Sequence, residues 1–279
     1  MTGDDLVGHV GPPALHVMTF NVRRRMGRLS WPAADRWSAR APRVQALLHA
    51  ERPGVLGVQE AMPDQAAFLQ DVLGSGFRSV GYGRSAQRSG EGCPLYYDHQ
   101  RFELLDWAQQ ALSDHPAVAG SRTWGNPVPR VIVRAVLRDR SSGATFTALN
   151  THWDPFSRAS RLRAAEQLRG IVSAASTPVI AMGDLNAPAA SSEVRALWDG
   201  GVMRDAWDTA ADRLTPEWET YAAYRRPRVG TRRIDFIAVS TGLVVDRIAI
   251  NARRYRGGWP SDHLPVQAVV LFAPDGTPA

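Results

Sequence analysis

Short apolar segments recur along almost the whole chain, and polar or glycine-rich stretches separate them. Segments of this kind, bounded by turn residues, predict β-strands. We expect strands at residues 16–20, 55–58, 95–97, 131–137, 146–149, 179–182, 234–239, 244–250 and 265–272. Elsewhere apolar residues recur with the helical period, which predicts helices at 43–50, 64–73, 161–174 and 193–197. Pro42 suits the first turn of a helix that begins beside it.

Helices separate the early strands, whereas several later strands follow one another directly. This order predicts mixed β-sheets covered by helices, an α/β layered fold. We expect one domain over residues 15–273, with flexible ends at 1–14 and 274–279. Residues 84–92 and 114–129 are rich in Gly, Ser, Pro and Arg, and we expect these loops to face a substrate.

The composition is that of an ordinary globular protein, with 279 residues, 44% hydrophobic and 22% charged. It excludes a disordered or fibrous protein, and no apolar run approaches the ~20 residues of a membrane-spanning helix. The first residues lack the basic and apolar regions of a secretory signal, so we expect a cytoplasmic protein. The single cysteine, Cys93, agrees with a reducing compartment and excludes a cysteine-rich zinc site.

The formal charge is +6, and all 33 basic residues are arginine. Codon usage in a GC-rich genome explains the choice of arginine over lysine. The positive charge itself favours an anionic, phosphate-bearing partner, because guanidinium groups bind phosphate oxygens in pairs. Nothing in the sequence indicates an obligatory protein partner.

Polar clusters adjoin the ends of six predicted strands. Four clusters follow their strand and two precede it, so antiparallel late strands would bring all six to one edge, where open α/β folds bind ligands. Each cluster alone has a plain structural explanation as a turn, a cap or a surface ion pair. The clusters contain Asn21; Glu60; His152 and Asp154; Asp184 and Asn186; Asp235; and Asp262 and His263.

This mixture of side chains suits a hard cation and a phosphate group. Mg²⁺ takes oxygen ligands, and it usually binds one or two carboxylates and keeps several waters. The absence of clustered cysteines and the small number of histidines argue against zinc. A histidine next to an aspartate, as at Asp262 and His263, indicates an oriented imidazole.

The segments MTFNV, GVQEA, NTHWD, GDLNA, RIDFI and SDHLPV occur in the order of the endonuclease/exonuclease/phosphatase superfamily. The chain resembles this superfamily from Val17 to Val270. The superfamily includes DNase I-like nucleases, inositol polyphosphate phosphatases, neutral sphingomyelinases and deadenylases. The segment GEGCPLYYDHQRFELLD is most similar to the deadenylase branch and to small bacterial relatives. The resemblance implies a four-layer sandwich of two mixed β-sheets flanked by helices, and metal-dependent hydrolysis of a phosphoester.

The resemblance also implies roles for the clustered residues. The implied metal ion is Mg²⁺, for which Mn²⁺ can substitute. Its ligands are Glu60, with Asn21 beside it, and Asp262. Asp184 activates water and Asn186 positions the phosphate or the nucleophile.

The two histidines complete the expected catalytic set. His263 holds the phosphate, oriented by Asp235 or supported by Asp262, and His152 contacts the phosphate or the leaving group. Glu91 is expected to partner His152.

Further candidates lie on the substrate side of the expected site. Arg130, Trp124, Asp154 and Asp235 are expected to contact the phosphate or the rest of the substrate, although Arg130 could instead brace the strand that follows it. Residues 23–40 contain six arginines, among them Arg23, Arg24, Arg25 and Arg28, and two tryptophans. They form either a solvated basic loop with packing tryptophans or a rim that contacts phosphates and stacks on bases.

Three functions fit the sequence. The first is a Mg²⁺-dependent phosphodiesterase that uses in-line attack of water on an anionic phosphoester, with a nuclease as one form of it. The second is a phosphomonoesterase or phospholipase acting on inositol phosphates or phospholipid. The third is an inactive relative that binds nucleic acid through its arginines, and the intact acidic and histidine residues argue against it. Metal-dependent turnover separates the third from the other two.

Overall fold

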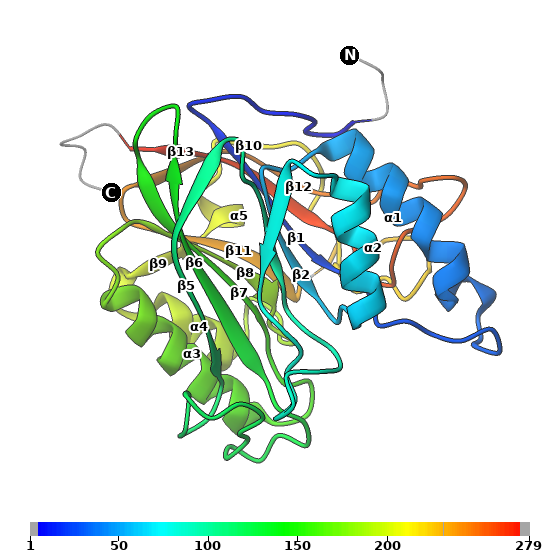
Figure 1. Cartoon of the computed structure of the whole chain (residues 1–279), viewed down its shortest axis with the longest axis horizontal. Helices are drawn as coiled ribbons and strands as arrows, with labels where there is room; N and C mark the ends of the chain where they lie inside the picture. Colours follow the sequence, from blue (N-terminus) through cyan, green and yellow to red (C-terminus); the bar gives the residue numbers. More distant parts are fainter. Residues whose placement is uncertain (1–4, 231, 274–279) are drawn as a thin grey trace.

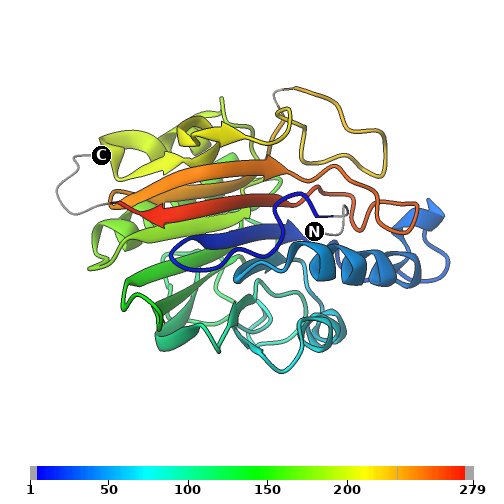
Figure 2. The ribbon, with the colours of Figure 1, turned by 90° about the horizontal axis from the view of Figure 1, so that it is seen from above.

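Two β-sheets pack face to face, with helices on their outer faces, in the computed structural model of the chain (Figures 1 and 2). The structure describes residues 5–230 and 232–273. Within these residues no helix has the length and apolarity needed to cross a membrane. The four layers are those implied by the resemblance, so the expected fold class is confirmed.

The first sheet has seven strands among the described residues, and β1 lies at its centre. The central strand runs parallel to its neighbour at 55–59 and antiparallel to its neighbour at 266–272. In spatial order the strands are β10 (Asp212–Arg213), β12 (Leu243–Ile250), β13 (Val266–Phe272), β1 (Leu15–Asn21), β2 (Val55–Gln59), β4 (Leu95–Asp98) and β3 (Phe77–Val80).

The second sheet has six strands within the same described ranges. In spatial order they are β5 (Phe102–Ala111), β6 (Val131–Asp139), β7 (Thr145–His152), β8 (Val179–Asp184), β11 (Asp235–Ser240) and β9 (Met203–Asp205). β7 runs parallel to β8, whereas β11 runs antiparallel to β8. The late strands β11 and β13 therefore enter their sheets from the edge at which β1, β2, β7 and β8 end, as the sequence predicts.

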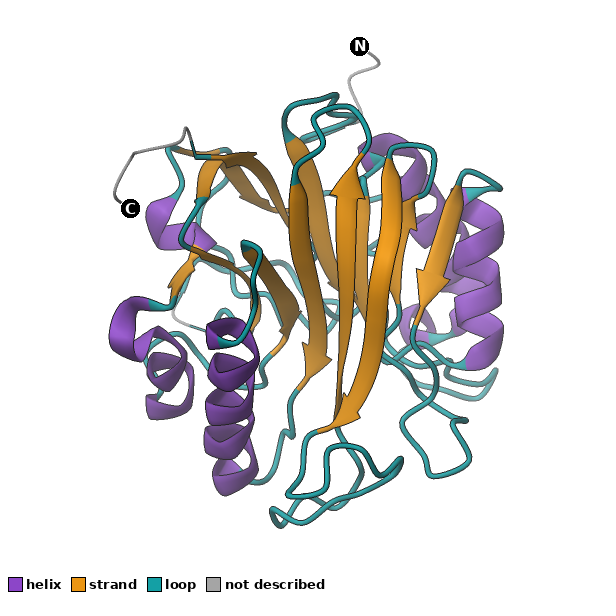
Figure 3. Cartoon of the chain, turned by 60° about the vertical axis from the view of Figure 1, so that its left-hand side comes forward, coloured by secondary structure: helices purple, strands orange, loops and turns teal. Residues whose placement is uncertain are grey.

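The helices cover the outer faces of both sheets (Figure 3). α1 (Trp37–Glu51) and α2 (Pro63–Leu73) pack on the first sheet, through a cluster that includes Phe20, Leu47 and Leu69. α3 (Arg158–Ser173) and α4 (Ser192–Trp198) pack on the second sheet around Trp153 and Leu168. The shorter elements are η1 (Ala33–Asp35), η2 (Asp199–Gly201) and α5 (Ala206–Thr209). A third apolar cluster fills the space between the sheets.

Some expected boundaries need correction. Helix α1 begins at Trp37 rather than at residue 43, so Pro42 lies inside it and not in its first turn. The buried Arg40 explains the longer helix, because its guanidinium donates to the carbonyl oxygens of Val22, Arg23 and Arg24.

Strands β3, β5, β9 and β10 are absent from the sequence prediction, and each lies at an edge of its sheet. β9 and β10 have only three and two residues, and several side chains of β3 and β5 face solvent. An edge strand with one solvated face has no continuous apolar run, so the apolar pattern could not indicate it.

The two ends of the chain were expected to be flexible, and residues 1–4 and 274–279 lie outside the described residues. The later part of the N-terminal segment is held in place. The backbone amides of Leu6, Val7 and Gly8 donate to the carboxylate of Glu51 in α1 at 2.9–3.1 Å.

A buried polar link fixes one sheet against the other. The Asn150 amide on β7 donates to the carbonyl oxygens of Val58, Cys93 and Pro94 at 2.8–3.0 Å. Its own oxygen accepts from Gln59 Nε2 at 2.7 Å. Because Asn150 is fully buried, these bonds replace hydration that the groups lose on folding.

We expect Asn150→Ala to lower the free energy of unfolding by about 3 kcal/mol, because it leaves several buried polar groups without partners. Urea unfolding followed by circular dichroism measures the change. Gln100→Ala, at an exposed turn position, is the control and should cost less than about 0.5 kcal/mol. A loss below about 1 kcal/mol for Asn150→Ala would show that this link does not hold the sheets together.

Candidate active site

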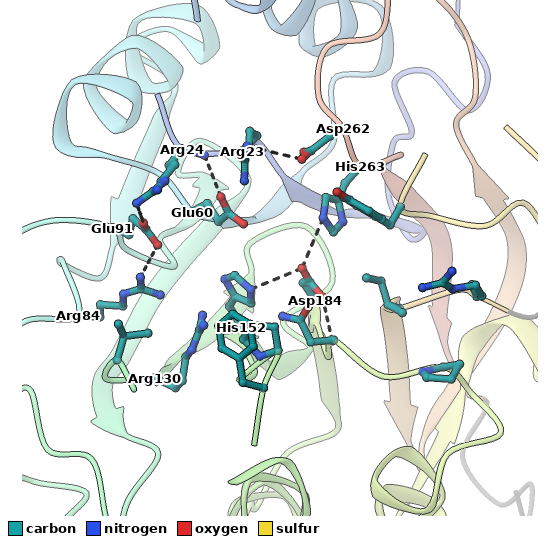
Figure 4. Close-up of a pocket in the computed structure, with 18 residues that line it drawn as sticks. Arg23, Arg24, Glu60, Arg84, Glu91, Arg130, His152, Asp184, Asp262 and His263 are labelled. Carbon is teal, nitrogen blue, oxygen red and sulfur yellow. Dashed lines mark hydrogen bonds and ion pairs between the residues drawn. The ribbon is translucent and has the colours of Figure 1, made fainter. Parts of the chain in front are cut away.

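A cavity of about 640 Å³ opens at the edge where the central strands of both sheets end (Figure 4). Its walls carry charged side chains of both signs. Of the residues expected at the site, those that line it are Glu60, Glu91, Arg130, His152, Asp184, Asn186, Asp262 and His263. Sequence segments distant from one another therefore converge, as the order of strands and polar clusters predicts.

Asp184 stands at the centre of this group (Figure 4). Its Oδ2 lies 2.9 Å from Asn21 Nδ2, 3.5 Å from His152 Nε2 and 3.8 Å from His263 Nε2. Its Oδ1 accepts from the backbone N–H of Asn186 at 2.9 Å. The carboxylate at the end of β8 thus meets an amide and two imidazoles from three other strand ends.

Burial and the neighbouring Asp235 carboxylate raise the pKa of Asp184 to about 7. Burial alone would lower the pKa of His263, but the carboxylates of Asp235 and Asp184 raise it well above its ordinary value. His263 Nδ1 lies 2.9 Å from Asp235 Oδ2, so the ring is both oriented and kept protonated.

His152 has the opposite electrostatic setting. Burial, together with the guanidinium charges of Arg130 and Arg84, lowers the pKa of His152 well below its ordinary value. The site therefore holds one charged and one neutral imidazole on either side of Asp184.

Close packing of β7 against β8 brings His152 beside Asp184, since the two residues are register partners. Gly183 permits this approach, because a Cβ at that position would lie 2.2 Å from the Thr151 carbonyl oxygen. The glycine of the GDLN segment is thus required by packing between strands.

Glu60 is fixed by hydrogen bonds to both of its carboxylate oxygens. Oε1 accepts from Asn21 Nδ2 at 3.1 Å, and Oε2 accepts from the backbone N–H of Arg24 at 3.0 Å. Its backbone has φ 62°, a left-handed conformation that costs a non-glycine residue about 1 kcal/mol. Strain of this kind is typical of functional sites.

Asn21 and Asp262 occupy the same wall as Glu60. The Asn21 amide nitrogen faces the two carboxylates, while its oxygen accepts from the backbone N–H of Arg23 at 2.9 Å. Asn21 therefore orients Glu60. Asp262 Oδ2 lies 3.6 Å from Arg23 Nε, and its Oδ1 lies 3.1 Å from the Ser261 hydroxyl oxygen.

The expected pairing of Glu91 with His152 is wrong. Glu91 lies between two arginines, with Oε2 2.5 Å from Arg84 Nη2 and Oε1 3.3 Å from Arg24 Nη1. The acid nearest to His152 is Asp184. Arginines in the loops at both sides of the cavity draw Glu91 away, and the sequence spacing alone could not show this.

The remaining candidates lie outside the cavity lining. Asp235 is buried behind His263, and Asp154 is buried behind Arg130, with Oδ2 3.3 Å from Arg130 Nε. Trp124 packs near α3, and its indole N–H donates to Asp114 at 2.8 Å. Of the two tryptophans in residues 23–40, Trp37 packs on Phe68, whereas Trp31 is 87% exposed.

Sequence analysis missed several residues that line the cavity or support it. Tyr221 stacks at a tilt against the His263 ring, with centroids 5.1 Å apart, and Phe156 is largely exposed at the rim. Neither belongs to a strand-end cluster, so no pattern indicated them. Arg84 lies in a loop that was expected to face the substrate.

The sequence matches the Endonuclease/Exonuclease/phosphatase family over residues 18–263, which is most of the chain. The chain belongs to this family, whose members hydrolyse phosphoesters. No protein with a curated function matches the sequence.

Solved structures of the family resemble the chain over nearly its whole length. A family protein from Bacteroides thetaiotaomicron has a TM-score of 0.87 and 24% identity, over 95% of this chain and 100% of that one. A family protein from Bacteroides vulgatus has a TM-score of 0.85 and 27% identity, over 93% of this chain and 99% of that one. A mannosyl-6-phosphatase from Bacteroides thetaiotaomicron has a TM-score of 0.84 and 25% identity, over 92% and 100%.

We expect Asp235→Asn to lower the pKa of His263 toward its ordinary value, because the substitution removes a charge beside Nδ1 and keeps the side-chain shape. The ring-proton resonances of the histidines, followed by NMR against pH, measure this. His16 is an internal control, since burial lowers its pKa to about 4 and neither Asp235 nor His263 contributes to that shift. An unchanged His263 titration would refute the role given to Asp235.

Proposed function

We propose that the protein is a phosphodiesterase that depends on Mg²⁺, or on Mn²⁺ in its place, and uses Asp184 as its general base. The observation that carries the proposal is the convergence of Asn21, His152 and His263 on Asp184 Oδ2. A pKa near 7 suits a group that accepts a proton at neutral pH.

The carboxylates on the Glu60 wall fit a hard divalent cation. Burial would raise the pKa of Glu60, but the Arg24 amide, the His263 charge and the Asn21 amide lower it, so this carboxylate is ionised. Glu60 would hold the cation, with Asp262 as a second oxygen donor and Asn21 as the group that orients Glu60. When bound, the cation polarises a phosphoryl oxygen and offsets the charge of the transition state.

The carboxylates of Asp184 and Asp235 and a nitrogen of His263 also lie within 4.8 Å of one another, close enough to hold an ion. We assign this group to proton handling instead. Each ring nitrogen of His263 already faces a carboxylate, and a protonated ring would repel a cation placed between them.

The chain's own groups supply the other steps of an in-line displacement. Asp184 accepts the proton of the attacking water. Asn186 donates its amide N–H to the Trp153 carbonyl at 2.9 Å, so its oxygen is the end that can orient this water. The charged His263 stabilises the phosphoryl oxygens, and the neutral His152 is placed to donate to the leaving oxygen.

A second candidate function is hydrolysis of a phosphomonoester. It is favoured by the similarity to the mannosyl-6-phosphatase, which extends over 92% of the chain at 25% identity. The arrangement around Asp184 serves either ester, because a water attacks phosphorus in both.

We expect Glu60→Gln to raise the Mg²⁺ concentration needed for half-maximal activity by on the order of 10–100-fold, because a neutral amide binds the cation more weakly. Hydrolysis of bis(4-nitrophenyl) phosphate during a Mg²⁺ titration measures it. Glu103→Gln on β5, an acid that does not line the cavity, is the matched control. Full activity of the wild-type protein in EDTA would contradict the proposed cation.

We expect Asp184→Asn to lower kcat by on the order of 10²–10⁴ with little change in KM, because it removes the proton acceptor and keeps the shape. Steady-state kinetics on bis(4-nitrophenyl) phosphate and on 4-nitrophenyl phosphate measure this, and the better wild-type substrate decides between diester and monoester. Asp246→Asn, at a partly exposed aspartate on β12 that does not line the cavity, is the control. A folded Asp184→Asn protein with near-normal kcat would remove the assignment of the base.

A further inference from the structure

Arg130 carries hydrogen-bonding capacity that the protein does not use. Its side chain is nine-tenths buried at the start of β6 and lines the cavity (Figure 4). Nε faces Asp154 Oδ2 at 3.3 Å, but among the described residues Nη1 is buried and has no hydrogen-bond partner. A buried charged donor without a partner is costly, so its retention points to a ligand.

Bracing of the following strand accounts for only one of the N–H groups of Arg130. Asp154 is itself held in place, because its Oδ1 accepts from the backbone amides of Phe156 and Ser157 at 2.9 and 2.8 Å. This aspartate therefore fixes the guanidinium in one orientation and leaves the unpartnered nitrogen available to a ligand.

A second guanidinium lines the cavity on the same side. Arg84 and Arg130 both lie on the side of His152 away from His263 in Figure 4, and Arg84 comes from the loop after β3. Burial lowers the pKa of Arg130, and the charge of Arg84 lowers it further, as expected for two guanidiniums that face the same cavity. The acid nearest to Arg84 is Glu91, which is shared with Arg24.

The charges of the cavity are thus unevenly distributed. Glu60, Asp184 and Asp262 lie on one side, where Arg23 and the protonated His263 face them. Arg84 and Arg130 lie on the other side beside Glu91, with a neutral His152 between the two sides. Two convergent guanidiniums are the usual protein site for a phosphate or carboxylate.

We propose that Arg84 and Arg130 form a second anion subsite, which binds a phosphate group of the substrate other than the one that is hydrolysed. The substrate class is then a phosphoester with two phosphate groups. The second group can belong to a small bisphosphate or to the next nucleotide of a chain. This inference rests on the proposed function, because it takes the hydrolysed phosphate to lie at Asp184 and His263.

The subsite is tested by binding, with turnover suppressed by Asp184→Asn. Calorimetry in Mg²⁺ compares adenosine 3′,5′-bisphosphate with adenosine 5′-monophosphate, and a thymidine dinucleotide with and without a 5′-phosphate. We expect the extra phosphate to tighten binding on the order of tenfold in at least one pair. The pair that responds identifies the source of the second phosphate.

The preference is the ratio of the two dissociation constants of a pair, without and with the second phosphate. Arg84→Gln and Arg130→Gln should each reduce this ratio toward one, because they weaken binding of the ligand with two phosphates more than binding of the other. Arg84 is the safer site, because its side chain is partly exposed and the variant should fold, which thermal unfolding verifies. Arg232→Gln, which removes another arginine of the cavity wall, is the matched control and should leave the preference unchanged.

Glu91→Gln should move the preference in the opposite direction, because it frees Arg84 and Arg24 from a competing carboxylate. An unchanged preference in both arginine variants overturns the subsite. Equal weakening of both ligands of a pair also overturns it, because the arginines would then hold the hydrolysed phosphate or act through overall charge. Failure of the proposed function would appear separately, as a wild-type protein that hydrolyses no ester in Mg²⁺.

Discussion

The Asn21 side-chain amide joins the two sheets at the point where the chemistry converges. It donates to Glu60 at the end of β2 and to Asp184 at the end of β8, and these strands belong to different sheets. Two ionised carboxylates so close would repel one another, and a shared donor reduces that repulsion. Asn21 is fixed in turn, because its backbone carbonyl accepts from the Ser261 hydroxyl at 2.7 Å.

The geometry of the site therefore depends on the contacts that fix the two sheets against each other and on those that fix the loop at residues 22–24. The hydrogen bonds that join Asn150 to Gln59 and to the Val58 carbonyl fix β7 against β2, close to the strand ends that carry His152 and Glu60. Arg40 holds the carbonyls of residues 22–24, which keeps the Arg24 amide on the Glu60 carboxylate. The helices contribute little to the cavity wall, although one of them supplies this arginine.

The sequence could predict those site residues that lie directly at the ends of strands. Apolar runs located the central strands, and the polar residues that adjoin them located Asp184, Glu60 and His263, since strand direction decides at which edge they lie. The edge strand β5 was not predicted, because polar side chains on its solvent face interrupt the run of apolar residues. The sequence could not predict the partner of Glu91 or the long-range contacts of Arg40. Both depend on loops that are distant in the sequence and meet only in the folded chain.

Each side of the cavity contains side chains of the opposite sign that reduce its charge. Arg23 lies 3.3 Å from Asp35 and 3.6 Å from Asp262 on the acidic side, and Glu91 lies between two guanidiniums on the basic side. Clustered like charges destabilise a fold, and these two side chains reduce that cost before any ligand is bound. A cation beside Glu60 and an anion beside Arg84 would each take over part of the same compensation. The arginines on the basic side of the cavity therefore explain why Glu91 pairs with arginine and why the acid beside His152 is Asp184.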